Sequence, residues 1–527
     1  MKTNRHVLLT FFLIAAAVSL RAETFDLVLR HGRVVDGAGN PASFADIAIK
    51  NGRIAAIGRI PGEAKAEIDA TGLIIAPGFI DVHTHAEEID ELPLGENFAR
   101  MGVTSIVLGN CGSSVLKVGD FFRRLESTNI SVNVATLMGH GSVRRKAMGG
   151  SFSRPPTVEE METMKQMVEE AMKEGAVGLS TGLIYLPGSY AKTEEIIEVA
   201  KVAAAYDGIY ASHMRGEGRE IFDSLAEVFR IAREARIRAE VSHIKLSGNR
   251  AWGQADQVIG AIENARAQGL DITQDQYVYT ASSTGLGQLV PEEYREKTKL
   301  RETLAHPEQK ARLAQEMKAT LKRNGRKDYA YAVIASYTAD PSLNGLNIVE
   351  AAKKKHGSSS LANQIELILE IEQHGGGSGV FHGISEGDLR KFLAHPNTMF
   401  ASDSGVRRYA EGVPHPRGYG NNARVLARYV RELKLLRLEE AVRRMTSLPA
   451  TAFRLQGRGE VREGNWADLV VFDPEKVQDH STFNDPHHYA TGFAYVFVNG
   501  VAVVKGDAHT GARPGMVLRH AVLKGGL

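Results

Sequence analysis

Residues Ala76–His85 read Ala-Pro-Gly-Phe-Ile-Asp-Val-His-Thr-His, an apolar segment that leads directly into a His-x-His pair. Alternate side chains of a strand point the same way, so His83 and His85 are expected on one face, about 6–7 Å apart along the chain. Two neutral imidazoles side by side supply half of a metal site. The alternative is two unrelated histidines at a polar strand end, and the rest of the chain has to decide between these interpretations.

After this motif the chain alternates between apolar runs and amphipathic stretches, the pattern of a parallel sheet covered by helices. Residues 157–175 and 224–236 have the spacing of helices. Counting the strand before His83, the sequence offers eight candidate strands, which predicts an α/β fold of the (β/α)8 barrel type. The other candidate strands are residues 104–108, 132–137, 176–179, 209–212, 238–242, 270–273 and 398–402.

Two further regions stand apart from this alternation. A charged, helix-prone stretch of about residues 286–347 separates the last two candidate strands, and we expect it to be an insertion near the barrel mouth. Both chain ends instead contain short alternating segments divided by Gly-rich turns, which is typical of antiparallel strands. We therefore predict that residues 23–78 and 446–527 together form one small β-sandwich, and that residues 79–445 form the barrel.

The first 22 residues have the features of a secretory signal peptide. Lys2 and Arg5 precede an apolar run over residues 7–18, and the segment ends at Ala22, a small residue suited to cleavage. The apolar run is too short to span a bilayer, so no stable membrane span is expected. The sequence predicts a secreted or periplasmic protein.

The overall composition is that of a globular protein. The 527 residues are 43% hydrophobic and 24% charged, with a formal net charge of +2. No basic stripe stands out, so nucleic acid is not predicted as a partner. Cys111 is the only cysteine and cannot form an internal disulfide, although an oxidising compartment is predicted. It is therefore either a buried apolar residue or a metal ligand.

Reactive groups of barrel enzymes lie at the carboxyl ends of the strands. A histidine at one strand end is more often structural, but zinc favours imidazole, thiolate and carboxylate ligands together, and ligation would explain a lone cysteine. A zinc-bound water can reach a pKa near ~7, and Asp403 could then carry its proton to a departing amine. The alternative for Asp403 is capping of the next helix. The donors that end or follow candidate strands are His83, His85, Cys111, His213, His243 and Asp403.

Taken together, these motifs resemble the amidohydrolase superfamily, and more specifically the D-aminoacylases (N-acyl-D-amino-acid deacylases). The resemblance implies a zinc ion held tightly by Cys111, His213 and His243, and a second, weaker site of His83, His85 and Asp403. Residues 178–181 contain no lysine, whereas many binuclear relatives carry a carboxylated lysine there, so dihydroorotases and hydantoinases are disfavoured. The resemblance covers nearly the whole mature chain and is carried by Ala76–His85, Gly109–Gly112, Gly139–Gly141, Leu179–Gly188, Ser212–Arg215, Ser242–Lys245, Ser402–Asp403, His415–Arg417 and Ala467–Val470.

The resemblance also implies a substrate with a free carboxylate. Arg417 and Lys245 occupy the carboxylate-binding places of the family, Tyr279 and Ser283 are expected nearby, and Tyr185 is a further candidate for the pocket. For Arg417 the alternative is a surface ion pair. The segment after Asp403 departs from the family pattern, which leaves side-chain preference and D-selectivity open.

The function implied is zinc-dependent hydrolysis of the amide bond of N-acyl-D-amino acids, releasing a carboxylate and a free amino acid. Within enzymes, the alternative is a related amidohydrolase acting on dipeptides, N-acyl-L-amino acids or cyclic amides. An exported, metal-containing binding protein is the alternative from a different class. The oligomeric state stays open.

Overall fold

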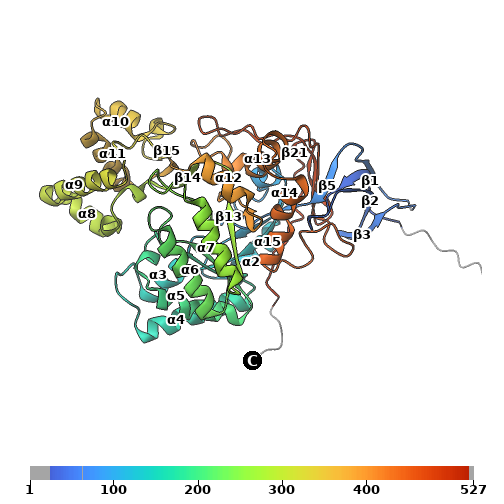
Figure 1. Ribbon diagram of the computed structural model, residues 1–527, viewed down its shortest axis with the longest axis horizontal. Helices are drawn as coiled ribbons and strands as arrows, with labels where there is room; N and C mark the ends of the chain where they lie inside the picture. The colour runs from blue at the N-terminus through green and yellow to red at the C-terminus, as the bar shows by residue number, and fades with distance from the viewer. Residues whose placement is uncertain (1–23, 62, 522–527) are drawn as a thin grey trace, which may run out of the picture.

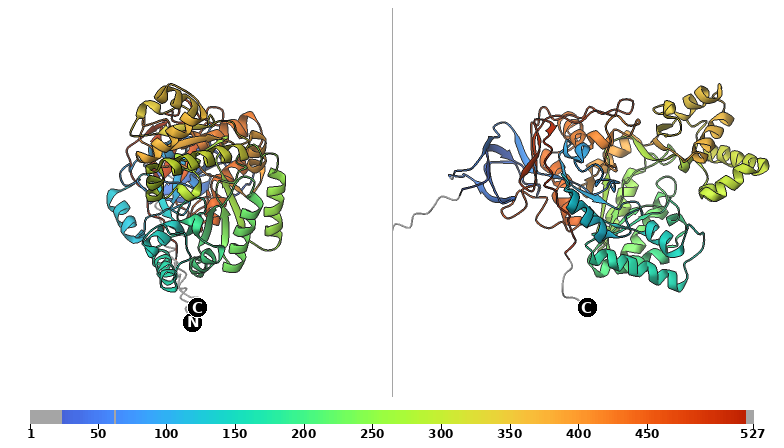
Figure 2. Two further views of the ribbon diagram at one scale, coloured as in Figure 1. Left: turned by 90° about the vertical axis from the view of Figure 1, so that its left-hand side faces the viewer. Right: turned by 180° about the vertical axis from the view of Figure 1, so that it is seen from behind.

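The computed structural model describes residues 24–61 and 63–521, and the predicted signal peptide, residues 1–22, lies outside them. In this described part of the chain, no helix combines the length and the apolar character that crossing a membrane requires. A sheet of N- and C-terminal strands lies at one end of the molecule and helices α8–α11 lie at the other (Figures 1 and 2). Parallel strands and their covering helices occupy the middle.

The middle of the molecule is built on two parallel sheets. One has the order β6-β7-β8 and the other the order β9-β10-β11-β12-β13-β17. β9 begins two residues after the end of β8, and a parallel bridge joins Thr84 to Ser404, so the sheets are linked at both ends. The strands are β6 Phe79–Asp81, β7 Val103–Leu108, β8 Asn133–Thr136, β9 Met138–Gly139, β10 Gly178–Gly182, β11 Ile209–His213, β12 Arg238–Val241, β13 Ile272–Gln276 and β17 Thr398–Phe400.

The seventh predicted strand ends too early. The predicted strand covers residues 270–273, whereas β13 covers Ile272–Gln276. Two of the buried polar side chains have partners inside the molecule: Gln274 Nε2 donates to Thr398 Oγ1 at 3.0 Å, and Asp275 Oδ2 lies 3.1 Å from His83 Nδ1. Thr273 Oγ1 has no hydrogen-bond partner among the described residues. Satisfied hydrogen bonds allow polar residues to continue a buried strand.

Helices follow the parallel strands and bury their apolar faces in a common core. The predicted helix over 157–175 is α4, which begins with a capping box between Thr157 and Glu160. The predicted helix over 224–236 starts earlier, at Ile221. The helices of this part are α1 Glu96–Ala99, α2 Val118–Thr128, α3 His140–Met148, α4 Val158–Lys173, α5 Thr193–Ala205, α6 Ile221–Ala235, α7 Ala255–Ala267, α12 Glu386–Ala394, α13 Arg417–Arg424, α14 Leu438–Met445 and α15 Ser447–Ala452.

Both chain ends contribute to one mixed sheet of order β21-β20-β19-β18-β5-β1-β2-β3, with β4 beside β1. Val470 pairs with Ala76, so the C-terminal strands dock directly upstream of the His-x-His motif. The prediction that the two ends meet is confirmed. The sheet is not purely antiparallel, because β1 pairs in parallel with β4 and β5, and its sandwich form stays a prediction. The strands are β1 Leu27–Val34, β2 Ser43–Lys50, β3 Arg53–Gly58, β4 Glu67–Asp69, β5 Ile74–Pro77, β18 Leu469–Phe472, β19 Phe493–Val498, β20 Val501–Lys505 and β21 Ala508–His509.

The insertion between β13 and β17 has its own hydrophobic core, which includes residues from Leu286 to Ile371. Its antiparallel sheet has the order β14-β16-β15. This unit extends beyond the predicted range of about 286–347 at both ends, because β16 returns to pair Val380 with Ser283 on β14. Its elements are β14 Ala281–Gly285, α8 Lys297–Ala305, α9 Pro307–Arg323, β15 Ala332–Ser336, α10 Ile348–His356, α11 Leu361–Gln373 and β16 Ser378–His382.

Candidate metal centre and substrate cavity

The Cys111 thiol lies at the centre of three imidazoles. Its Sγ is 3.3 Å from His83 Nε2, 3.6 Å from His213 Nδ1 and 3.7 Å from His243 Nε2. Each residue ends or closely follows a parallel strand, β6, β7, β11 or β12. The carboxyl ends of neighbouring parallel strands meet at one rim, so residues far apart in sequence reach one point.

A second group of donors adjoins the first through His83. His85 Nε2 lies 3.3 Å from Asp403 Oδ1, and His83 Nε2 lies 3.7 Å from the same oxygen. Asp403 follows β17, and the next residue, Ser404, is bridged to Thr84, which lies between the two histidines after β6. The structure therefore brings together all the side chains predicted as metal ligands.

Three of these donors have a backbone conformation that side chains other than glycine rarely adopt. The φ angles of Cys111, His243 and Asp403 are 54°, 37° and 50°. Such conformations cost roughly 1–3 kcal/mol each and cluster at functional sites. Tertiary hydrogen bonds hold them here, because His243 N donates to Asp275 Oδ1 at 3.0 Å and Asp403 N donates to His83 O at 2.9 Å.

The donor set fits zinc. The groups His83–Cys111–His243 and His83–His85–Asp403 each have their ligand atoms within 4.8 Å of one another. Burial acts to raise the pKa of the Cys111 thiol, but the His83 charge and hydrogen bonds from the imidazoles hold that pKa well below its usual range. His213 Nε2 is buried with no hydrogen-bond partner among the described residues. A thiolate among imidazoles and a carboxylate is a ligand combination that zinc prefers.

Asp275 supports this centre but was not predicted. Its Oδ2 lies 3.1 Å from His83 Nδ1, so the other ring nitrogen of His83 is free to face Cys111. Carboxylates in this position fix the tautomer and orientation of a ligating histidine. The available signal was the place of Asp275 two residues after the predicted seventh strand, residues 270–273.

Glu217 is a second supporting carboxylate that sequence reasoning missed. Its Oε1 lies 2.9 Å from His243 Nδ1 and accepts a hydrogen bond from Lys245 Nζ at 2.6 Å. Burial acts to raise the pKa of Glu217, but Lys245 and the two nearby histidines lower it overall. The available signal was an acidic residue four positions after His213. Glu217 thus links the metal centre to a predicted substrate-binding lysine.

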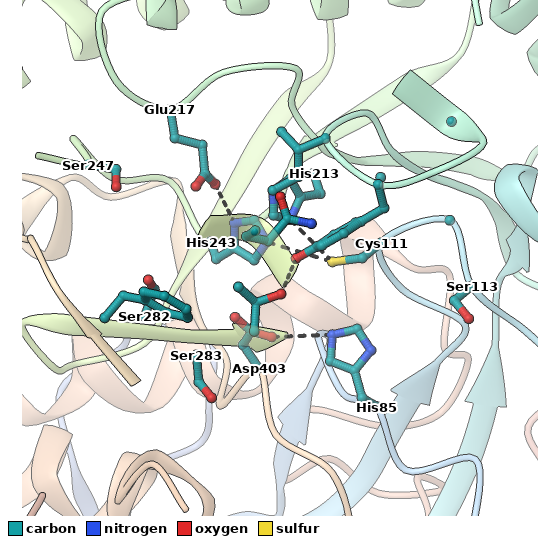
Figure 3. Close-up of a pocket in the computed structure, with 18 of the residues that line it drawn as sticks. His85, Cys111, Ser113, His213, Glu217, His243, Ser247, Ser282, Ser283 and Asp403 are labelled. Atoms are coloured by element: carbon teal, nitrogen blue, oxygen red, sulfur yellow. Dashed lines mark hydrogen bonds and ion pairs between the residues drawn. The ribbon is translucent and has the colours of Figure 1, made fainter. Parts of the chain in front are cut away.

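A cavity of about 540 Å3 opens over the donors. His85, Cys111, His213, His243 and Asp403 line it, whereas His83 is completely buried. In Figure 3, Glu217 and His213 lie above His243, Cys111 lies to its right, and the Asp403–His85 pair lies below it.

Three of the predicted substrate contacts, Lys245, Ser283 and Tyr185, line the cavity. The Tyr185 hydroxyl lies 3.0 Å from Thr284 Oγ1, and its ring contacts His213 edge-on with centroids 4.9 Å apart. Lys245 is held by Glu217 at the cavity wall. These placements are compatible with substrate binding, which stays a prediction for each residue.

Arg417 and Tyr279 are not among the described residues that line this cavity. The Arg417 guanidinium lies behind Asp403, with Nη1 2.8 Å from Asp403 Oδ2 and Nη2 donating weakly to Ser283 O at 3.4 Å. Tyr279 is buried between the Arg424 guanidinium and the His415 ring. Carboxylate binding by Arg417 and Tyr279 therefore stays a prediction, and the ionic contact of Arg417 in this structure is with Asp403.

The fold and the site define an amidohydrolase: the chain belongs to the Amidohydrolase family, whose model matches residues 66–504. It is similar to a D-aminoacylase from Alcaligenes xylosoxydans xylosoxydans, with 35% identity over 94% of this chain and 98% of the relative. A solved D-aminoacylase with a binuclear metal centre matches with a TM-score of 0.81 and 33% identity, covering 94% of this chain and 100% of its own. An N-acyl-D-glutamate deacylase from Bordetella bronchiseptica, solved with zinc and a phosphonate inhibitor, matches with a TM-score of 0.81 and 32% identity over the same shares.

Proposed function

We propose that this protein is a zinc-dependent deacylase that hydrolyses the amide bond of N-acyl-D-amino acids. The observation that carries the proposal is the Cys111 thiol among three imidazoles, with Asp403 beside them at the wall of one cavity. Similarity to D-aminoacylases over nearly the full chain supports the substrate class. We interpret the linked parallel sheets as the predicted (β/α)8 barrel, and export of the chain remains part of the proposal.

Zinc would be held tightly by Cys111, His213 and His243, and a second ion would use His83, His85 and Asp403. When bound, zinc supplies Lewis acidity, which polarises the acyl carbonyl and lowers the pKa of water. The deeply buried His83, fixed by Asp275, adjoins both groups of donors. The chain's own contribution is a rigid arrangement of donors, because strand ends and buried hydrogen bonds hold it before substrate arrives.

Asp403 is the group placed to move the proton. Burial acts to raise its pKa, but the Arg417 guanidinium and His83 hold that pKa well below its usual range, so the side chain is a carboxylate. It lines the cavity and can accept a proton from the attacking water and deliver it to the departing nitrogen. Lys245 and Ser283 also line the cavity, and in this proposal they bind the substrate carboxylate.

The test is amine release from paired N-acetyl-D- and N-acetyl-L-amino acids, before chelation, after chelation, and after zinc is returned. Release from the D series alone, lost on chelation and restored by zinc, would support the proposal. Release from the L series, dipeptides or cyclic amides would keep the metal chemistry and change the substrate class. A protein that binds zinc and hydrolyses none of these compounds would support the binding-protein alternative.

A further inference from the structure

The insertion forms one wall of the substrate cavity and brings a charged side chain to it. Arg326, just after α9, lines the cavity together with Tyr331, Phe381 and His382. Metal donors that end or follow parallel strands line the same cavity. The face of the insertion that meets the cavity is therefore both cationic and aromatic.

Arg326 is fixed in place without being neutralised. Its guanidinium lies 3.6 Å from the centre of the Tyr331 ring, and Nη2 donates to His382 O at 3.3 Å. Within residues 24–61 and 63–521, no carboxylate forms an ion pair with Arg326. A stacked, pre-positioned guanidinium loses little freedom when it binds a carboxylate at two points.

Three of the other charged groups that line the cavity, Lys245, Glu217 and Asp403, are already paired. Lys245 is bonded to Glu217 at 2.6 Å, and Asp403 faces Arg417 at 2.8 Å. Arg145, at the exposed rim, donates to Leu186 O at 2.8 Å and has no ion pair in the described part of the chain. Because the proposed function assigns the substrate α-carboxylate to Lys245 and Ser283, the positive charge at Arg326 is left for a second anionic group.

We propose that Arg326 binds a second carboxylate of the substrate, so that the enzyme prefers N-acyl-D-amino acids with two carboxylates. This inference rests on the proposed function and deepens it. The second carboxylate has two possible sources, an acidic amino-acid side chain or a dicarboxylic acyl group. Either would form charge-assisted hydrogen bonds with a guanidinium that is half-buried and unpaired in the described residues.

Two pairs of substrates of similar shape separate the sources. N-acetyl-D-glutamate against N-acetyl-D-glutamine reports on the side chain, and N-succinyl-D-leucine against its terminal amide reports on the acyl group. The measured quantity is the ratio of kcat/KM within each pair. A charged hydrogen bond corresponds to a preference of roughly tenfold to a hundredfold for the dicarboxylic member of one pair.

Arg326→Ala should collapse that ratio toward one, and Arg326→Lys should restore part of it. Arg323→Ala is the matched control, since Arg323 is exposed on α9 and donates only to Thr320 Oγ1 among the described residues. It should leave the ratio unchanged. Circular dichroism of each variant verifies folding.

The outcomes distinguish this inference from the proposed function. Hydrolysis of the mono-anionic substrates with no preference for the dicarboxylic member of either pair, or a preference that survives Arg326→Ala, overturns the inference alone. If Arg145→Ala loses the preference and Arg326→Ala keeps it, the preference belongs to Arg145 at the rim, and the inference is also overturned. Hydrolysis of none of the four compounds, alongside the N-acetyl-D-amino acids tested above, overturns both.

Discussion

Arg417 Nη1 lies 2.8 Å from Asp403 Oδ2, and both side chains are buried. The same guanidinium stacks over the Tyr277 ring at 4.5 Å, so it is held from behind as well. Asp403 meets His85 through its other oxygen. The carboxylate proposed to move the proton is therefore fixed between a guanidinium and an imidazole.

This contact predicts the effect of Arg417→Met. Removing one partner of a buried ion pair leaves the other charge uncompensated, which destabilises the protein by about 3–5 kcal/mol. We expect kcat for an N-acetyl-D-amino acid to fall by at least about tenfold, with a smaller change in KM and a lower melting temperature. Steady-state kinetics and thermal unfolding provide the measurements. A rise in KM with kcat unchanged would instead support the carboxylate-binding role and contradict this one.

Asp403→Asn tests the proton-transfer role and separates an enzyme from a binding protein. The amide has the same shape but cannot accept the proton, so hydrolysis should fall by about 10²–10⁴-fold. Zinc held by Cys111, His213 and His243 should remain bound, as elemental analysis after gel filtration would show. Turnover at the wild-type rate would rule out Asp403 as the proton carrier.

Cys111→Ser should remove the tightly held zinc. The serine hydroxyl does not ionise near neutral pH, whereas the imidazoles around Cys111 favour its thiolate. We expect zinc content and amide hydrolysis to fall together. Ser113→Ala is the control, because Ser113 lines the same cavity and belongs to none of the candidate ligand groups found in the described residues. Retention of zinc by Cys111→Ser would contradict the assignment.

A pH-dependent contribution to stability is expected away from the metal centre, at Glu195. Its Oε1 accepts from Arg144 Nε at 2.9 Å and lies 2.9 Å from His140 Nε2, with both partners fully buried. Burial acts to raise the pKa of Glu195, but His140 and Arg144 lower it overall. A lowered carboxyl pKa stabilises the folded state above the unfolded value of about 4.3, and this contribution is lost as pH falls through the folded pKa.

Glu195→Gln should therefore lower the free energy of unfolding by about 3 kcal/mol at neutral pH. The difference between Glu195→Gln and wild type in the free energy of unfolding should become smaller below about pH 4. Glu194→Gln is the neighbouring control, since Glu194 is exposed and pairs with Arg230 at the surface, and it should stay within about 0.5 kcal/mol of wild type. Denaturant unfolding of wild type and both variants, at neutral pH and below about pH 4, measures these differences in the free energy of unfolding. Equal destabilisation at both would contradict the ionic role of Glu195.

Much of the site could be predicted because local pattern determines it. The apolar run before His83 and His85 predicts a strand, and β6 lies there, although it ends at Asp81 and both histidines follow it. The same reasoning applies to Cys111, His213 and Asp403, each at the end of an apolar run. Since parallel strands deliver their carboxyl ends to one rim, the sequence predicted which residues would meet.

The partners of those ligands could not be predicted in the same way. Asp275 lies within a buried polar strand, and its partners come from distant segments: His243 N donates to Asp275 Oδ1, and His83 Nδ1 lies 3.1 Å from Asp275 Oδ2. Glu217 is in a loop, and its link to Lys245 depends on how two strand ends pack. Motif position predicts that Arg417 binds the substrate, and its ion pair with Asp403 was not foreseen from the sequence.

By itself, the sequence determined the alternating architecture, the meeting of the chain ends and the set of metal donors, because these follow from periodicity and residue type. Only the tertiary structure decided which donor faces which, that Arg417 and Tyr279 lie outside the lining of the cavity, and that the insertion carries Arg326 into it. The physical reason is how far apart in the sequence the interacting residues lie. Strand and helix patterns are properties of neighbouring residues, whereas pairing of buried charges depends on side chains that packing brings together from distant segments.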